Sequence, residues 1–222
     1  MDDTRLPAGA ERIVELFERH ARWYDAQLVL ERRALTLAAA LAEPLAGARV
    51  VDVGAGTGAL SSALLARSPR LAELTLLDAS PSMLARARRR LSAIHPTPRI
   101  LIADARALPL PAASADVVVM GYLLHLLDER DRRRALAEAR RVIAPQGRLV
   151  AVVHGSPRGL VGGLYRAAWR AIARLSPGAV GRGPMVDLAS AVEEAGFTID
   201  AAQRLPGVYW SEVVRAVPAA SR

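Results

Sequence analysis

The sequence has no cysteine, no lysine and no long apolar run, and aromatic residues make up only 4% of it. Without cysteine, the chain has no disulfide, iron–sulfur cluster, thiolate metal site or cysteine nucleophile. Although 52% of the residues are hydrophobic, prolines, glycines and arginines interrupt every apolar stretch before it reaches the roughly 18 residues of a membrane-spanning helix. We therefore expect a soluble protein, and its 222 residues are enough to bury the core of one domain.

All basic side chains other than histidine are arginines, and the formal net charge is +8 with a pI near 11.1. A nucleic-acid-binding surface is expected to interleave basic and aromatic side chains. The arginines instead cluster in ARARRRL and DERDRRRALAEARRVI, which are typical of solvated helix faces. We predict no specific nucleic-acid partner, and only a general attraction to anionic surfaces.

The start of the chain, MDDTRLPAGAER, lacks the basic segment followed by an apolar one that marks a secretory signal. We expect a cytoplasmic protein. The sequence does not indicate an oligomeric state.

Short apolar runs alternate with helical patterns along the chain. Strands are predicted at RVVDV, LTLLD, RILIAD, ADVVVM and PQGRLVAVV. Helices are predicted at LSSALLAR, at PSMLARARRRL with Ser80 as cap and Pro81 in the first turn, and at DERDRRRALAEARRVI with Asp128 as cap. Strict alternation predicts a parallel sheet with helices on both faces, and FTIDAAQRL and VYWSEVVRAV predict a final antiparallel hairpin. The expected fold is a doubly wound, mostly parallel, seven-stranded α/β sheet of Rossmann-like type.

The stretch VVDVGAGTGAL, residues 50–60, interrupts an apolar strand with three glycines at every second position. They lie where the first strand ends and the first helix begins, which is the edge of an open α/β sheet where ligands bind. Gly54 is expected to turn the chain, while Gly56 and Gly58 leave the backbone amides accessible. Gly54, Gly56 and Ala59 also fit the dinucleotide-binding pattern, so the glycines leave open two ligand classes and a tight turn without a ligand.

Three aspartates end or follow the first three predicted strands. Asp52 lies beside the glycine loop, where it would repel a pyrophosphate but accept a ligand with an ammonium and a sulfonium group. Asp78 ends the second strand, where a carboxylate can accept both hydroxyls of a ribose. Asp104 follows the third strand, within reach of an adenine amino group. Each aspartate alone could be a cap or turn residue, but three at successive strand ends favour one shared site.

Together these segments resemble the class I S-adenosylmethionine-dependent methyltransferases from about Trp23 to Val153. VVDVGAGTG is similar to the first motif of that family, LLDAS to the second, and ADARALPLP to its adenine-binding turn. ADVVVMGYLLHLL is similar to the fourth strand with its following loop, and RRVIAPQGRLVAV to the helix, turn and fifth strand that come next.

The resemblance implies S-adenosyl-L-methionine as cofactor. Gly54 and Gly56 would contact its methionine part, Asp78 the ribose hydroxyls, and Asp104 with Ala105 the adenine. The other cofactor contacts that we predict are Asp52, Ala79, Gly121, Met83 beside the adenine ring, and Tyr24 over the methionyl end.

Several methyltransferase classes are excluded. A cytosine C5 enzyme needs a cysteine nucleophile. Amino-methylating DNA enzymes carry an Asn or Asp, Pro-Pro, aromatic signature where this chain has MGYLLH, and metal-dependent catechol-type enzymes carry a cluster of acids there. The subgroup that the chain resembles contains menaquinone and ubiquinone C-methyltransferases and small-molecule relatives, among them bacterial phospholipid N-methyltransferases. We therefore predict a metal-free enzyme that methylates a small molecule or a lipid.

Methyl transfer is an in-line displacement at the methyl carbon of a sulfonium. Holding the acceptor near that methyl group therefore lowers the activation free energy by several kcal/mol, on the order expected for proximity effects. A base adds roughly 10² to 10⁴ in rate where a proton must be removed. His125, after the fourth strand, and His154, just past the fifth, are the predicted candidates for this base, and His20 and Tyr122 are weaker ones. The alternative for each histidine is a packing or cofactor-contact role.

Two segments outside the predicted cofactor-binding core of residues 46–155 are expected to select the acceptor. Residues 1–45 contain the helix ERIVELFERHARWYD, which we expect to act as a lid. Residues 156–184 contain an inserted amphipathic helix, VGGLYRAAWRAIARL, and residues 185–222 a C-terminal helix and the hairpin. The inserted helix fits a roof over an apolar pocket, a contact with an anionic membrane surface, or ordinary packing on its own domain.

The leading functional hypothesis is methylation of a small, hydrophobic acceptor by S-adenosylmethionine. The alternatives are a phospholipid or quinone methyltransferase at the membrane surface, a protein that binds the cofactor without methylating, and a nicotinamide-dependent dehydrogenase. The sequence leaves open whether nitrogen, oxygen or carbon is methylated.

Overall fold

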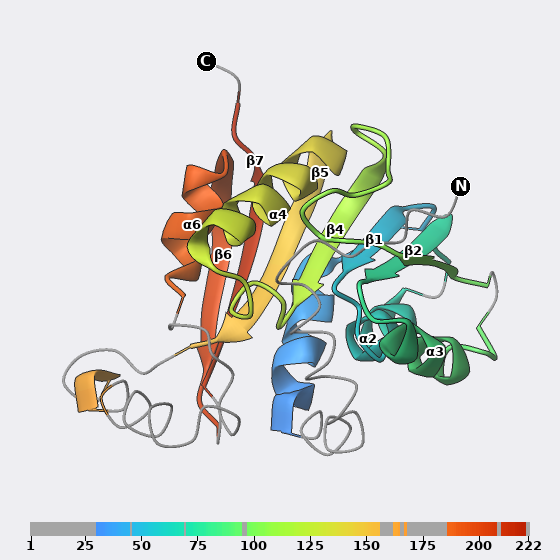
Figure 1. Ribbon diagram of the computed structural model, residues 1–222, viewed down its shortest axis with the longest axis horizontal. Helices are drawn as coiled ribbons and strands as arrows, with labels where there is room; N and C mark the ends of the chain where they lie inside the picture. Colours follow the sequence, from blue (N-terminus) through green and yellow to red (C-terminus); the bar gives the residue numbers. More distant parts are fainter. Residues whose placement is uncertain are drawn as a thin grey trace.

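The chain forms one seven-stranded sheet in the order β3-β2-β1-β4-β5-β7-β6 (Figure 1). The computed structural model describes residues 30–44, 46–68, 70–94, 97–155, 162–164, 167, 186–207 and 210–220. The strands are β1 (Arg49–Val53), β2 (Glu73–Asp78), β3 (Arg99–Ile102), β4 (Ala115–Gly121), β5 (Ile143–His154), β6 (Phe197–Leu205) and β7 (Ser211–Pro218). β1 to β5 pair in parallel, whereas β7 is antiparallel to both β5 and β6. The predicted sheet with its antiparallel end is confirmed.

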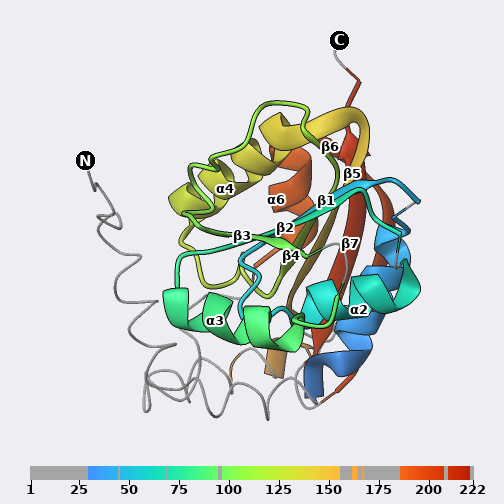
Figure 2. The same cartoon turned by 90° about the vertical axis from the view of Figure 1, so that its right-hand side faces the viewer.

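Helices cover both faces of the sheet (Figure 2). One face carries α2 (Ala59–Arg67), α3 (Pro81–Arg90) and a helix over residues 30–42. The other carries α4 (Glu129–Val142) and α6 (Leu188–Glu194). This two-sided cover is why the central strands are rich in valine and leucine.

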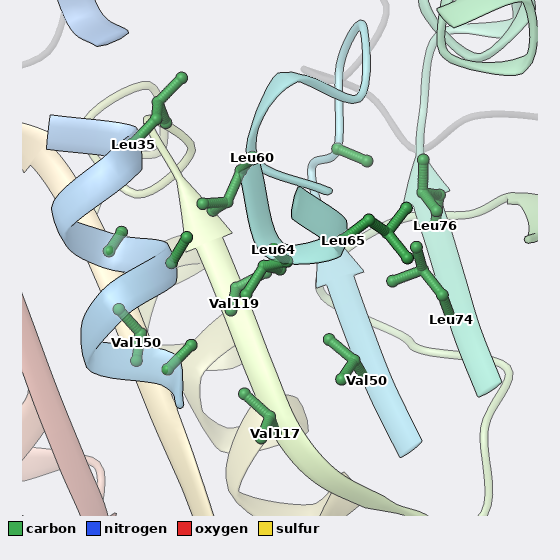
Figure 3. Close-up of a cluster of buried hydrophobic side chains, with 14 of the residues drawn as sticks. Leu35, Val50, Leu60, Leu64, Leu65, Leu74, Leu76, Val117, Val119 and Val150 are labelled. Carbon is green, nitrogen blue, oxygen red and sulfur yellow. The ribbon is translucent and has the colours of Figure 1, made fainter. Parts of the chain in front are cut away.

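The side chains of β4 show how the strands divide between two cores. Val117 and Val119 point to the face with α2, where Val119 lies near Leu64 (Figure 3). Val118 and Met120 point to the face with α4. Because successive strand residues face opposite sides, a strand covered on both sides is apolar at every position. An acidic side chain in such a strand, as in β1, therefore stands out.

Strand and helix do not alternate strictly, because no helix connects β3 to β4. Residues 103–114 form turns there, as the resemblance of ADARALPLP to an adenine-binding turn implies. Pro109 and Pro111 lack amide hydrogens and disfavour helix in the residues before them. The turn segment leaves the end of β3 uncovered by a following helix.

The predicted helix starts are confirmed. The Ser80 hydroxyl accepts the Met83 amide at 3.3 Å, and Pro81 is the first residue of α3. The Asp128 carboxylate accepts the Asp131 amide at 2.8 Å at the start of α4. Acidic residues lie in the first turn of α4 and arginines in its last turn, as the helix dipole favours.

Two predicted segments fall largely outside the described residues. Of the N-terminal lid, residues 30–44 are described, and of the inserted helix only residues 162–164 and 167. Within the described part of the chain, no helix is long and apolar enough to cross a bilayer.

Replacing Asp128 with alanine is expected to lower the free energy of unfolding by about 1 kcal/mol, because the Asp131 amide loses its acceptor. Asp128→Asn keeps an acceptor oxygen and should unfold close to wild type. Urea denaturation followed by circular dichroism measures both variants. Equal stability of wild type and Asp128→Ala would show that this cap does not stabilise α4.

Candidate functional site

The chain order of the sheet reverses between β1 and β4. β2 and β3 lie on one side of this point, and β5, β7 and β6 on the other. In open α/β sheets, ligands bind in the crevice outside the carboxyl ends of the strands at such a point. Asp52 lies in β1, Asp78 ends neighbouring β2, and Asp104 follows β3. The sheet therefore brings the three predicted aspartates to one edge.

The glycine loop leaves β1 and enters α2 with three backbones in the left-handed region. Gly54 has φ 70°, Gly56 φ 53° and Gly58 φ 75°. A side chain at Gly54 would in addition place its Cβ 2.9 Å from Leu123 Cδ2. Backbone strain thus explains why glycines occur at every second position, because other residues rarely adopt this conformation.

Asp78 holds the glycine loop against the end of β2. Its Oδ2 accepts the Gly56 amide at 2.8 Å, and its Oδ1 accepts the Ser80 amide at 2.8 Å. Burial raises the pKa of Asp78, while these amides oppose the rise. Each oxygen retains a lone pair for a hydroxyl donor. Asp78 is therefore placed both to fix the loop and to bind a ribose.

Asp52 is a buried acid with an incomplete set of hydrogen bonds. Its side chain is 1% exposed, and its Oδ2 accepts the Ser61 hydroxyl of α2 at 2.6 Å. Oδ1 has no hydrogen-bond partner among the described residues. Burial raises the pKa of Asp52 to about 7, the Ser61 bond opposes this, and the charge of Asp78 adds to it. A carboxylate in this state favours a positively charged or hydrogen-donating ligand.

A pocket with about 300 Å³ of empty space, partly open to solvent, lies between the glycine loop and the helix over residues 30–42. Leu35 and Leu60 form apolar walls, near the end of β4 in Figure 3. The complete lining is Glu31, Leu35, Asp52, Gly54, Ala55, Thr57, Ala59, Leu60, Gly121 and Tyr122.

Glu31, His154, His125 and Tyr122 form a cluster beside this pocket. Glu31 is 2% exposed, and its Oε1 lies 3.6 Å from His154 Nε2. The ring of His154 is 4.6 Å from that of His125 and 4.7 Å from that of Tyr122, centre to centre. The Tyr122 hydroxyl bonds to Ser211 Oγ of β7 at 2.7 Å. The structure thus brings together the two predicted catalytic histidines, which come from different segments.

Both histidines are neutral at physiological pH. Burial lowers the pKa of His154 to about 4. Burial, the charge of His154 and the charge of Arg132 lower the pKa of His125 well below its usual value. His125 Nδ1 is buried and has no hydrogen-bond partner among the described residues. Neutral imidazoles can accept a proton, but these low pKa values make them weak bases.

Asp104 is held by Arg106. The Arg106 amide, Nε and Nη2 donate to the Asp104 carboxylate at 2.8, 2.9 and 2.7 Å, while Nη1 donates to Asp131 in α4. Partial burial alone would raise the pKa of Asp104, but Arg106 keeps it below its usual value. The carboxylate is fixed and ionised, with most of its acceptor capacity already used. An adenine amino group would have to share it with Arg106.

The other predicted contacts are spread around the same edge. Gly121 lines the pocket. Ala79 and Ala105 are half-buried beside Asp78 and Asp104. Met83 is only 2% exposed, so it supports the α3 side of the site from within the core. Tyr24 and the weaker base candidate His20 lie outside the described residues.

Comparison with known proteins agrees with this geometry. Residues 50–147 match the model of a family described as a methyltransferase domain. Demethylmenaquinone methyltransferase of Thermus thermophilus is 37% identical over 150 residues, covering 67% of this chain and 65% of the relative. Malonyl-[acyl-carrier protein] O-methyltransferase of Halorhodospira halophila is 37% identical over 141 residues, 63% of this chain and 46% of the relative. An S-adenosylmethionine-dependent methyltransferase from Thermotoga maritima shares the fold, with a TM-score of 0.68 at 22% identity over 91% of this chain and 98% of that structure.

Residues 50–147 thus form a methyltransferase domain, and the chain is similar to class I S-adenosylmethionine-dependent methyltransferases. It spans less than two thirds of the length of the two curated relatives, whose names give different acceptors.

The residues present fit the cofactor of this methyltransferase family. S-adenosylmethionine carries an ammonium and a sulfonium group, and Asp52 offers a buried carboxylate oxygen without a partner among the described residues. The glycine loop lets a ligand approach the backbone closely, and Asp78 is placed for a ribose. Charge and shape therefore agree at the same strand ends.

Sequence reasoning missed three side chains of this methyltransferase site. Ser61 supplies the hydrogen bond to Asp52, Arg106 fixes Asp104, and Glu31 faces His154. Arg106 could have been found, because it lies two residues after Asp104 in the predicted turn. Ser61 and Glu31 give no such local signal, because their partners are assembled only by the packing of helices on the sheet.

Asp78→Ala is expected to weaken the binding of S-adenosylhomocysteine by about 1.5 to 3 kcal/mol, the range for hydrogen bonds to a charged group. Calorimetric titration measures the dissociation constant, and thermal unfolding reports on the fold. Asp78→Asn is the matched variant, because it keeps one acceptor oxygen for the loop amides and should lose less affinity. Unchanged affinity together with a lower melting temperature would show that Asp78 only supports the loop.

Proposed function

We propose that the protein transfers a methyl group from S-adenosylmethionine to a small, hydrophobic acceptor. The proposal rests chiefly on two buried carboxylates, Asp52 and Glu31, that line one pocket beside the glycine loop. A dinucleotide would bring its pyrophosphate to such a loop, and buried acids repel that charge. The cationic end of S-adenosylmethionine is attracted by the same acids.

The chain's own residues divide the work of binding. In this proposal, Asp52 receives the ammonium end, the backbone around Gly54 and Gly56 contacts the methionine part, and Asp78 binds the ribose. Asp104, fixed by Arg106, and Ala105 lie at the adenine side. The cofactor supplies the reactive methyl group on a sulfonium.

The apolar walls of the pocket favour a hydrophobic acceptor. Leu35, Leu60 and Tyr122 line the pocket, and the Tyr122 ring lies 4.7 Å from that of His154. An acceptor that reacts through a carboxylate would be repelled by Glu31 and Asp52. The favoured reacting group is therefore a hydroxyl, an enol, an amine or an electron-rich carbon.

The two histidines restrict the chemistry further. With lowered pKa values, His154 and His125 remove protons effectively only from acidic groups, such as a phenol or quinol hydroxyl. For other acceptors their role is to orient the substrate, and the rate then comes mainly from proximity to the methyl group. We assign His154 the first role, because Glu31 lies 3.6 Å away and stabilises the imidazolium formed.

A membrane-surface variant of this function is the second candidate. It is favoured by the similarity to a demethylmenaquinone methyltransferase, whose name indicates a quinone acceptor. The arginine-rich inserted helix that would contact lipid lies mostly outside the described residues, although Leu164 within it is 68% exposed. Either variant would act in the cytoplasm or on its membrane face.

Calorimetry is expected to show binding of S-adenosylmethionine and S-adenosylhomocysteine and no binding of NADH. A panel of quinols, phenols, amines and malonyl thioesters should then reveal methylation of one hydrophobic class by mass spectrometry. Flotation with anionic liposomes separates the membrane-surface variant from the small-molecule one.

Affinity for NADH without affinity for S-adenosylhomocysteine would contradict the proposed function. Tight cofactor binding without methylation of any acceptor in the panel would favour a protein that binds the cofactor for another purpose.

A further inference from the structure

The turn segment between β3 and β4, residues 103–114, is tied to α4 by side chains of that helix. The Leu108 amide donates to Glu138 Oε2 at 2.7 Å. Arg141 Nη1 donates to the Leu110 carbonyl at 2.7 Å, and its Nη2 donates to the Leu108 carbonyl at 3.0 Å. The polar face of α4 therefore fixes the shape of the turn segment.

Arg106 ties the start of the turn segment to the start of α4. Its Nη1 donates to Asp131 Oδ2 at 2.5 Å, and its Nη2 donates to Asp104 Oδ2 at 2.7 Å. The side chains of Arg106, Asp104 and Asp131 are 12%, 15% and 21% exposed. Because one guanidinium bridges two carboxylates, moving Arg106 away from Asp104 would also disturb its ion pair with Asp131.

The Asp104 carboxylate has little acceptor capacity left for another donor. An ionised carboxylate offers about four lone-pair sites. Asp104 Oδ1 accepts the Arg106 amide at 2.8 Å and Nε at 2.9 Å. Asp104 Oδ2 accepts Nη2 at 2.7 Å and Nε at 3.1 Å. Each oxygen thus already accepts two contacts, and all of them come from Arg106.

An adenine amino group competes poorly with Arg106 for this carboxylate. A guanidinium that faces both oxygens of a carboxylate forms a strong bidentate ion pair, whereas the amino group is a neutral donor that supplies one bond. Displacing Arg106 would also leave a nearly buried guanidinium with fewer partners, which is unfavourable. The ion pair is therefore expected to persist when a ligand is bound.

We propose that Arg106 determines how the site recognises the nucleobase: it keeps the Asp104 carboxylate occupied, so the exocyclic amino group of adenine is not bound there. This inference rests on the proposed function, because it takes the adenine end of S-adenosylmethionine to lie at Asp104. The resemblance to other methyltransferases assigns the adenine contact to Asp104 and Ala105, and the Arg106 contacts change the part assigned to the carboxylate. Recognition of the base then depends on the shape of the turn segment that α4 fixes.

The test compares two ligands by calorimetric titration of the full chain. One is S-adenosylhomocysteine, and the other is its analogue in which unsubstituted purine replaces adenine, so that only the amino group is missing. The dissociation constant of the analogue divided by that of S-adenosylhomocysteine is the selectivity ratio, which measures how strongly the site binds the amino group. A general loss of structure in the turn segment weakens both ligands and leaves this ratio unchanged.

Two variants are expected to move the selectivity ratio differently. Asp104→Ala should leave it within about twofold of wild type, even where both ligands bind more weakly, because the carboxylate does not contact the amino group. Arg106→Met should raise it about tenfold, because the released carboxylate can then accept the amino group in a bond to a charged acceptor. Arg106→Lys keeps a cation beside Asp104 and should retain the wild-type ratio.

Arg49→Met is the matched control. Arg49 holds Asp116 much as Arg106 holds Asp104, since its amide and its Nη2 each donate to that carboxylate at 2.8 Å. This pair lies near the amino ends of β1 and β4, at the sheet edge opposite the predicted site. Arg49→Met should therefore leave the selectivity ratio unchanged although it loses the same kind of ion pair.

A fall of the selectivity ratio by more than about twofold in Asp104→Ala would show that this carboxylate binds the amino group, and would overturn the inference. A ratio in Arg106→Met no higher than in wild type would also overturn it. If Arg106→Met does not fold, the result for Asp104→Ala still decides. These outcomes leave the proposed function intact, whereas failure of the wild-type protein to bind S-adenosylhomocysteine would contradict that function itself.

Discussion

The buried carboxylate of Asp52 is the constraint around which the site is organised. It lies in the central strand β1, where both faces are covered and the neighbouring residues are valines. Oδ2 accepts one short hydrogen bond from Ser61, and Oδ1 has no hydrogen-bond partner in the described part of the chain. Burial raises the pKa of Asp52 to about 7. A buried carboxylate oxygen without a hydrogen-bond partner lowers the stability of the free protein. It is retained where a cationic ligand completes its interactions.

The topology of the sheet converts this local feature into a binding site. Parallel pairing of β1 with β2, and of β2 with β3, aligns their carboxyl ends. Asp78 therefore lies next to the glycine loop and accepts a hydrogen bond from the Gly56 amide. Arg106 fixes Asp104 on the far side by tying it to α4. The loop, the ribose-side acid and the adenine-side acid are thus held by separate elements that meet at one edge. Glu31 adds a second negative charge from the helix over residues 30–42.

The parts of this account that could be predicted from the sequence are those encoded over short distances. Apolar runs, the caps Ser80 and Asp128 and the glycine pattern identify strands, helix starts and the ligand edge, because each depends on neighbouring residues. The turn between β3 and β4 is of the same local kind, because its prolines disfavour a helix. The contacts of Glu31 and Ser61 could not be predicted, because packing of helices from distant segments creates them. The pairing of His125 with His154 is of the same kind, since each histidine was a candidate alone.

The most direct test of the central claim is the number of protons released when S-adenosylmethionine binds. At a pH of about 6.5, Asp52 in the free protein is largely protonated, since its pKa is about 7, and a bound cation should lower that pKa and release roughly half a proton or more. Calorimetry in buffers of different ionisation enthalpy measures this number. Asp78 and Glu31 face the same site, so subtraction of the Asp52→Asn result isolates Asp52. The account predicts release by wild type that is largely lost in Asp52→Asn, and equal proton release by the two proteins would contradict it.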